Sequence, residues 1–136
     1  VDDRVEVVLR RDAFERDPQA FIKKWQRKES KLRKEILSAR AALAQVETGR
    51  DVLEDAAALC QTLGTDGLRG EITLMKAARA LAAAKGGSAA TRVELLQIAP
   101  SVLRHRLRRN PLDDASSSTR VARAIADLFG SESTGC

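Results

Sequence analysis

The residues best suited to chemistry lie between Gly64 and Ile72, where the chain reads Gly-Thr-Asp-Gly-Leu-Arg-Gly-Glu-Ile. The glycines predict a turn that opens onto a helix, and Thr65 or Asp66 would cap the free N–H groups at its start. Arg69 then lies in the first turn, where a cation opposes the helix dipole. Its guanidinium could grip an external phosphate through a planar fork of donors. The same pattern also fits a solvated or ion-paired arginine.

Other catalytic constellations are absent from the sequence. It contains neither a Gly-x-x-x-x-Gly-Lys-Ser/Thr phosphate loop nor a Gly-x-Gly-x-x-Gly motif. His105 is the single histidine, so the chain cannot supply a Ser-His-Asp, Cys-His or His-rich metal site. Its carboxylates alternate with Lys and Arg, as on a solvated or ion-paired helix surface. We therefore expect no metal site here, and any catalytic role must be completed by residues outside this chain.

Two basic clusters are candidates for nucleic-acid binding. The first consists of Lys23, Lys24, Arg27, Lys28, Lys31, Arg33 and Lys34, and the second of Arg104, His105, Arg106, Arg108 and Arg109. The first cluster contains one aromatic residue, Trp25, which falls on an apolar stripe rather than among the cations. The second cluster ends a predicted helix, where the dipole favours cations. Both clusters therefore favour subunit contacts or a solvated surface, and we expect no nucleic-acid partner.

The two cysteines, Cys60 and Cys136, are too few for a disulfide framework and favour a reducing compartment. Cys60 falls on the apolar side of a predicted helix, which favours a small core residue. A redox role for Cys60 would need a partner thiol, from Cys136 or from outside the chain.

Length and composition predict one helical domain. The chain has 136 residues, a net charge of +5 and 32% charged residues of both signs, which suits a helical surface with ion pairs. Its ends resemble no signal peptide, and no apolar run reaches the roughly 20 residues that a membrane span needs. The first residue is Val1 rather than Met, which suggests a chain excised or processed from a longer polypeptide.

Hydrophobic spacing predicts six helices. We expect them at 3–14, 17–46, 51–63, 68–85, 91–107 and 119–129. In the first segment Val5, Val7 and Leu9 also alternate, so a strand remains open there. Apolar residues of the second helix form one stripe along a long rod, and the fourth helix is apolar on most sides, as expected for a central helix. The fold class is all-α, an irregular bundle of four to six helices.

Local signals mark the ends of these helices. Asp17 and Pro18 form a start signal, and Asp51 with Glu54 and Thr91 with Glu94 are spaced as capping boxes. Pro100 should kink or split the fifth helix near Ile98. Residues 113–119 form a polar, Ser-rich linker, and residues 131–136 are expected to be disordered.

Several of these motifs, in this order, carry a family resemblance. They are Asp-Pro-Gln-Ala-Phe from Asp17, Leu-Gly-Thr-Asp-Gly-Leu-Arg-Gly-Glu from Leu63, Ala-Ala-Arg-Ala-Leu-Ala from Ala77, and Leu-Arg-His-Arg-Leu-Arg-Arg-Asn-Pro-Leu-Asp from Leu103. From about Arg4 to Phe129 the chain resembles the C-terminal helical lid of the small, I-type ATPase subunit of magnesium chelatase, an AAA+ protein. The segment Ser-Thr-Arg-Val-Ala-Arg from Ser118 is similar to the end of that subunit.

The resemblance implies a domain organisation. Residues 1–16 would form a connecting helix from an ATPase core, residues 17–112 the helical lid, residues 113–130 a linker and C-terminal helix, and residues 131–136 a tail. It also implies that Arg69 is the sensor-2 arginine, a catalytic and cofactor-binding residue that contacts the γ-phosphate of ATP. Arg79 and Arg104 fall in matching motifs, with ion pairing within or between subunits as the expected role. In some plastid relatives the cysteine at the place of Cys60 takes part in thiol regulation.

The resemblance further implies an enzyme complex that inserts Mg²⁺ into protoporphyrin IX during chlorophyll and bacteriochlorophyll synthesis. ATP and Mg²⁺ would be bound mainly by the ATPase core, so this segment alone should be inactive. The implied partners are that core, further copies in a homo-oligomeric ring, a larger AAA+ subunit with an integrin-like domain and, indirectly, the porphyrin-binding catalytic subunit. The compartment would be bacterial cytoplasm or chloroplast stroma. An alternative is an autonomous helical module that binds a protein or polyanion through its basic faces.

Overall fold

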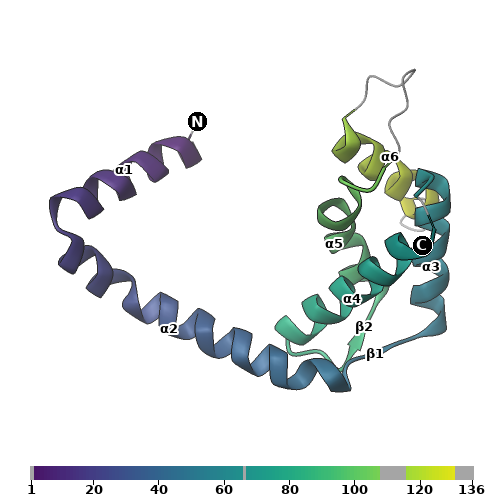
Figure 1. Ribbon diagram of the computed structural model, residues 1–136, viewed down its shortest axis with the longest axis horizontal. Coiled ribbons are helices and arrows are strands. Elements are labelled where there is room, and N and C mark those ends of the chain that lie inside the picture. Colours follow the sequence, from purple (N-terminus) through teal and green to yellow (C-terminus); the bar gives the residue numbers. More distant parts are fainter. Residues whose placement is uncertain (1, 66, 108–115, 131–136) are drawn as a thin grey trace, which may run out of the picture. The chain divides into compact units, whose positions relative to one another are not determined.

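The computed structural model describes residues 2–65, 67–107 and 116–130. Within these ranges the chain forms six α-helices, one 3₁₀ turn and two short strands (Figure 1). The helices are α1 (Asp2–Arg16), α2 (Pro18–Ala42), α3 (Arg50–Leu63), α4 (Arg69–Ala84), α5 (Arg92–Leu103) and α6 (Ser117–Phe129). The predicted all-α class is confirmed.

The chain divides into two compact units, Val1–Ser38 and Ala39–Cys136. The first unit holds α1 and most of α2, and no described residue of α1 or α2 is buried. The first segment is a helix rather than a strand, with i,i+4 ion pairs such as Arg10–Glu6 at 2.6 Å that favour helical spacing. The start signal is confirmed, because the Asp17 carboxylate accepts from the Ala20 N–H at 3.0 Å.

An aromatic cluster joins α1 and α2. The rings of Phe14 and Phe21 meet edge to face with centroids 5.7 Å apart, and the centroid of Trp25 lies 5.9 Å from that of Phe21. Arg10 and Lys28 lie over the Trp25 ring, 4.7 and 4.5 Å from its centroid. These contacts hold the helix pair together without a buried core.

The second helix ends earlier than its apolar stripe predicted. α2 stops at Ala42, and a 3₁₀ turn, η1 (Leu43–Gln45), leads to Val46, which is buried. Val46 has extended backbone, which lets its side chain enter the core of the second unit. The prediction that helix runs to Val46 is therefore wrong, because packing of Val46 competes with continued helix.

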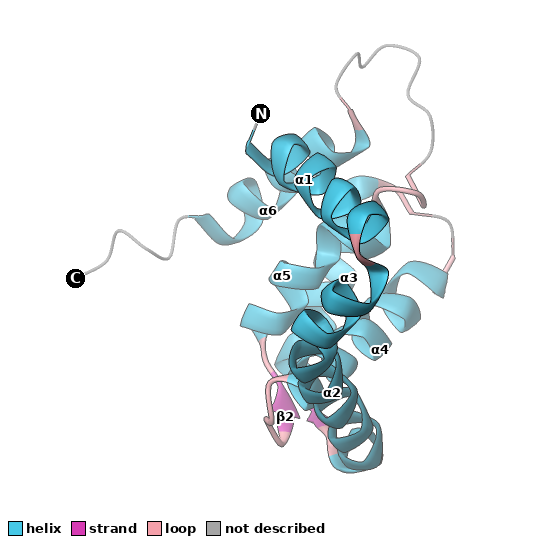
Figure 2. Ribbon diagram, turned by 90° about the vertical axis from the view of Figure 1, so that its left-hand side faces the viewer, coloured by secondary structure: helices cyan, strands magenta, loops and turns pink. Residues whose placement is uncertain are grey.

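Two short strands, β1 (Glu47–Thr48) and β2 (Ala89–Ala90), were not predicted. They pair in parallel, with Glu47 opposite Ala89 and Thr48 opposite Ala90, and are the magenta segments of Figure 2. Because parallel strands need a long crossover, α3 and α4 lie between them in sequence. The strand pair therefore connects the segment before α3 with the segment before α5.

The core of the second unit is built around α4, as expected for a helix that is apolar on most sides. α4 packs on α3, α5 and both strands, and α6 packs on α3 and α5 (Figure 1). The largest side chains without exposure are Leu59, Leu74, Leu95, Leu103 and Val121, which come from all four helices. Burial of these side chains is the main stabilising contribution.

Two predicted capping boxes have opposite outcomes. The box of Thr91 and Glu94 is present, with the Val93 N–H donating to Thr91 Oγ1 and the Thr91 N–H to the Glu94 carboxylate. The predicted capping box of Asp51 and Glu54 is absent. α3 begins at Arg50 after Gly49 without a side-chain cap, and Glu54 instead accepts from Arg50 Nε at 2.9 Å.

The fifth helix is neither split nor as long as predicted. Pro100 lies inside α5, whose last turn still closes through the Arg104 N–H and the Pro100 carbonyl at 3.3 Å. A proline near the end of a helix removes one hydrogen bond, and the packing of Leu103 holds the helix despite that loss. α5 ends at Leu103 because the chain then turns toward Thr65.

The last helix begins two residues before its predicted start, after a Ser116 cap whose hydroxyl accepts from the Thr119 N–H. The predicted start of the linker at 113–115 and the predicted tail at 131–136 lie outside the described residues. Among the helices in the described ranges, none combines the length and apolar character that crossing a membrane would require.

Candidate phosphate-contacting site

The turn before α4 depends on two glycines. Gly64 ends α3 with φ of +66°, and Gly67 has φ of +60°. These left-handed conformations strain residues that carry a Cβ atom. The Gly64 and Thr65 N–H groups both donate to carbonyls of the last turn of α3, at 3.1 Å. The end of α3 is therefore fixed immediately before α4 begins.

Gly70 brings the first turn of α4 against α3. A Cβ atom on Gly70 would lie 2.9 Å from Thr65 Oγ1 and 3.1 Å from Cys60 Sγ. Gly70 itself is buried, so its missing side chain makes room for this contact. The close approach sets where the backbone of Arg69 lies.

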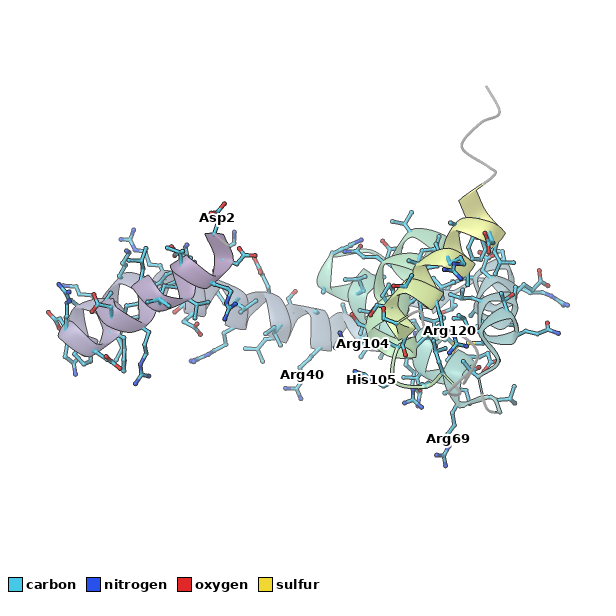
Figure 3. The ribbon with its side chains drawn as sticks, turned by 90° about the horizontal axis from the view of Figure 1, so that it is seen from above. Asp2, Arg40, Arg69, Arg104, His105 and Arg120 are labelled. Atoms are coloured by element: carbon cyan, nitrogen blue, oxygen red, sulfur yellow. The ribbon has the colours of Figure 1, made fainter. Side chains whose placement is uncertain are left out.

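Arg69 is the first residue of α4 and is exposed. Figure 3 shows its side chain projecting away from the helices of the second unit. Across the residues that the structure describes, the Arg69 guanidinium has no hydrogen bond or ion pair. Its charge is therefore available to a ligand, which distinguishes it from the ion-paired arginines such as Arg50 and Arg92.

One of the two expected caps of this helix is wrong, and the other lies outside the described residues. Leu68 occupies the N-cap position and makes no side-chain capping hydrogen bond. Thr65 does not cap α4, because its hydroxyl donates to the Cys60 carbonyl at 3.3 Å, and Asp66 lies outside the described residues. Among the described residues, no side chain accepts a hydrogen bond from the N–H groups at the start of α4, which lie beside the Arg69 guanidinium. Free N–H groups of this kind attract anions.

Cys60 lies beneath this turn, fully buried, as the small core residue that the sequence favoured. Burial raises the pKa of the Cys60 thiol, the hydrogen bond with Thr65 lowers it, and the Glu71 carboxylate raises it. Burial outweighs the other causes, so the thiol stays protonated and is a poor nucleophile in this conformation.

The second basic cluster lies next to the turn, a relationship that the sequence did not predict. Thr65 and Leu107 form an antiparallel bridge, which joins the turn before α4 to the segment after α5. Arg104 and Arg106 in that segment are exposed, and Arg104 Nε donates to His105 Nε2 at 2.9 Å. Arg108 and Arg109 lie outside the described residues. The first basic cluster is exposed on α2 in the other unit.

The fold and this turn define a lid of the AAA class. The AAA lid domain family matches residues 53–128, more than half of the chain, and the chain belongs to that family.

The relatives are magnesium-chelatase subunits, which confirms the resemblance. The chain is 53% identical over 129 residues to the magnesium-chelatase 38 kDa subunit of Cereibacter sphaeroides and 50% identical over 129 residues to that of Rhodobacter capsulatus. It is 38% identical over 126 residues to the chloroplast magnesium-chelatase subunit ChlI of Oryza sativa subsp. japonica. These alignments cover 95%, 95% and 93% of this chain, but 39%, 37% and 30% of the respective relatives. The chain therefore spans well under half the length of these proteins.

Arg69 and the start of α4 supply donors suited to a phosphate. The described ranges contain no group of three or more His, Cys, Asp or Glu side chains that could hold a metal ion.

Proposed function

We propose that this chain is the lid of the ATP-hydrolysing subunit of a magnesium chelatase, and that Arg69 is its sensor-2 arginine. The observation that carries the proposal is the exposed Arg69 guanidinium at the start of α4, which has no hydrogen bond or ion pair among the described residues. The family and the magnesium-chelatase relatives support the same reading.

In this function Arg69 contacts the γ-phosphate of ATP bound by an ATPase core. A positioned guanidinium stabilises the negative charge that develops on the transferring phosphoryl group. The two left-handed glycines and the close contact of Gly70 with Thr65 keep the start of α4 in place, so the position of the lid and the position of Arg69 change together. Nucleotide state is thereby coupled to lid position.

The whole protein would use the energy of ATP hydrolysis to drive Mg²⁺ insertion into protoporphyrin IX. Its partners would be further copies in a ring, a larger AAA+ subunit with an integrin-like domain and, indirectly, the porphyrin-binding subunit. Bacterial cytoplasm or chloroplast stroma is the compartment that the relatives suggest. The segment alone would not hydrolyse ATP.

The test is ATP hydrolysis by this chain mixed with the separately expressed ATPase core of its longer protein. We expect the wild-type chain to restore hydrolysis and Arg69→Ala to lower kcat by at least about a hundredfold. Arg123→Gln, an exposed arginine on α6, is the control. If the pieces bind each other and Arg69→Ala hydrolyses ATP at the wild-type rate, the sensor role is wrong.

The alternative, an autonomous binding module that uses basic faces, predicts a different pattern. Neutralising Arg104, Arg106, Arg108 and Arg109 would then abolish binding of its protein or polyanion, whereas Arg69→Ala would do little. The exposure of Arg104 and Arg106 is the observation in its favour.

A further inference from the structure

A basic cavity lies where the end of α2 and the η1 turn meet α4. It has a volume of about 440 Å³ and is lined by Arg40, Leu43, Ala44, Lys76 and Arg79. All five residues belong to the second unit, so the cavity is part of one compact body. It shares α4 with the turn before Arg69, but its residues lie further along that helix and in the end of α2 and η1.

Helical spacing explains why the three cations converge. Lys76 and Arg79 are three residues apart on α4 and therefore share one face of that helix. Arg40 stands in the last turn of α2, one turn before Leu43 and Ala44. Packing of η1 on α4 brings the two sets of residues together.

Arg79 is held in this cavity as a partly desolvated charge. One of its terminal nitrogens, Nη2, donates to the Leu43 carbonyl at 3.4 Å, and its Nε is buried without a hydrogen-bond partner. A buried guanidinium nitrogen without a partner leaves part of the positive charge uncompensated. A long bond to one neutral carbonyl compensates little of the guanidinium charge.

The cavity lacks a counter-charge of its own. Neither Arg40, Lys76 nor Arg79 has a carboxylate within ion-pair distance in the part of the chain that the structure describes. Elsewhere in the second unit, Arg50, Lys85 and Arg92 each have an acidic partner. Three like charges at one cavity repel one another, so an anion in it would be stabilised by all three.

We propose that this cavity binds the carboxylate side chains of an acidic segment from another protein chain. The exposed Arg40 and Lys76 side chains can pair with carboxylates, and Arg79 adds a third positive charge. The exposed apolar surface of Leu43 and Ala44 fits the methylene groups of a glutamate, which a free inorganic anion lacks. The surface is therefore a protein-docking site, separate from the phosphate contact proposed for Arg69.

The test measures binding of a hexaglutamate peptide to the full 136-residue chain by isothermal titration calorimetry at constant ionic strength. Inorganic phosphate and a hexaserine peptide are the comparison ligands. We expect hexaglutamate to bind and Arg79→Gln and Lys76→Gln each to weaken it about tenfold. Arg123→Gln removes the same charge from exposed α6 and should leave affinity within about twofold of wild type.

Circular dichroism melting shows whether each variant is folded. Lys76 is exposed, so Lys76→Gln keeps the test valid even if Arg79→Gln unfolds the domain. Equal weakening by Arg123→Gln would mean general attraction to the net positive charge and would overturn the proposal. Binding of phosphate at the cavity without binding of hexaglutamate would overturn it as well, because the ligand would then be a free anion.

Discussion

Thr65 Oγ1 occupies the space that a methyl group on Gly70 would need, 2.9 Å from the position of its Cβ. The same oxygen donates to the Cys60 carbonyl, so it cannot simply turn away without loss of that bond. The contact joins the end of α3 to the first turn of α4, and through it the core of the domain determines where Arg69 stands.

This contact predicts that Gly70→Ala lowers stability although alanine favours helix. We expect overpacking to cost about 1–3 kcal/mol, partly offset by about 1 kcal/mol of helix propensity. Thermal or urea unfolding measures the difference. Thr65→Ala removes the clashing oxygen, so the double variant should lose less stability than the sum of the two single variants. If the stability losses of the two single variants simply add in the double variant, the two residues have no steric contact that affects stability.

A second prediction concerns Arg92, which connects α5 to α3. Its Nε and Nη2 donate to the two oxygens of Asp55 at 2.6 and 3.0 Å, and its guanidinium lies 5.2 Å from the centroid of the Phe129 ring. Arg92→Lys keeps the charge but cannot form this fork. We expect a loss of about 1 kcal/mol in the free energy of unfolding, since the pair is only partly buried.

Asp55→Asn is the partner variant for a double-mutant cycle with Arg92→Lys. A coupling energy near zero in that cycle would contradict the role given to the pair. Exposed pairs such as Arg50–Glu54 provide the comparison, and their removal should change stability by only a few tenths of a kcal/mol.

The capping box at the start of α5 predicts a dependence of stability on pH. Hydrogen bonds from the Thr91 side chain and backbone, and then from Lys85, lower the pKa of Glu94 from 4.5 to about 2. Because the folded pKa is the lower one, this stability is present above pH 4.5 and is lost as pH falls toward 2. Wild type should therefore lose more stability than Glu94→Gln across that window. Parallel melting curves for the two proteins would exclude this contribution.

Cys60 gives a prediction about thiol reactivity. Because the side chain is buried and its pKa is raised, alkylation by iodoacetamide at pH 8 should be far slower than that of a free cysteine. In the Cys136→Ser variant, Cys60 is the one remaining cysteine, so the labelling rate measures its reactivity alone. Labelling should become fast when urea unfolds the domain. Rapid labelling of the folded protein would contradict this prediction, because it would mean that the turn above Cys60 opens readily. The thiol regulation implied by the resemblance to plastid relatives would require such opening.

Local signals predicted the features that depend on neighbouring residues. The Asp17 start, the Thr91–Glu94 box and a turn at Gly64–Gly67 are set by backbone groups a few residues away, so the sequence contains their causes. Two failed predictions of helix ends depend on distant residues. α2 stops short because Val46 packs into the core, and α5 ends at Leu103 where the chain turns toward Thr65.

The candidate site likewise has one part that the sequence predicted and another part that depends on the fold. A motif of neighbouring residues pointed to Arg69, whereas the fold decides that its guanidinium has no partner among the described residues. The close contact of Gly70 with Cys60 and Thr65 could not be derived from spacing, because it depends on how α3 and α4 pack. The cavity at Arg40, Lys76 and Arg79 gave no sequence signal, since Arg40 lies on a different helix from the other two.

The sequence by itself therefore determined the helices, the caps at Asp17 and Thr91–Glu94 and the arginine that opens α4, because periodicity and capping act over one or two turns. Tertiary structure alone decided the parallel β1–β2 pair and the Thr65–Leu107 bridge. Each of these joins segments whose separation along the chain exceeds the reach of local propensity, or depends on the packing of whole helices. Such contacts form only when the apolar faces of α3, α4, α5 and α6 are removed from water together.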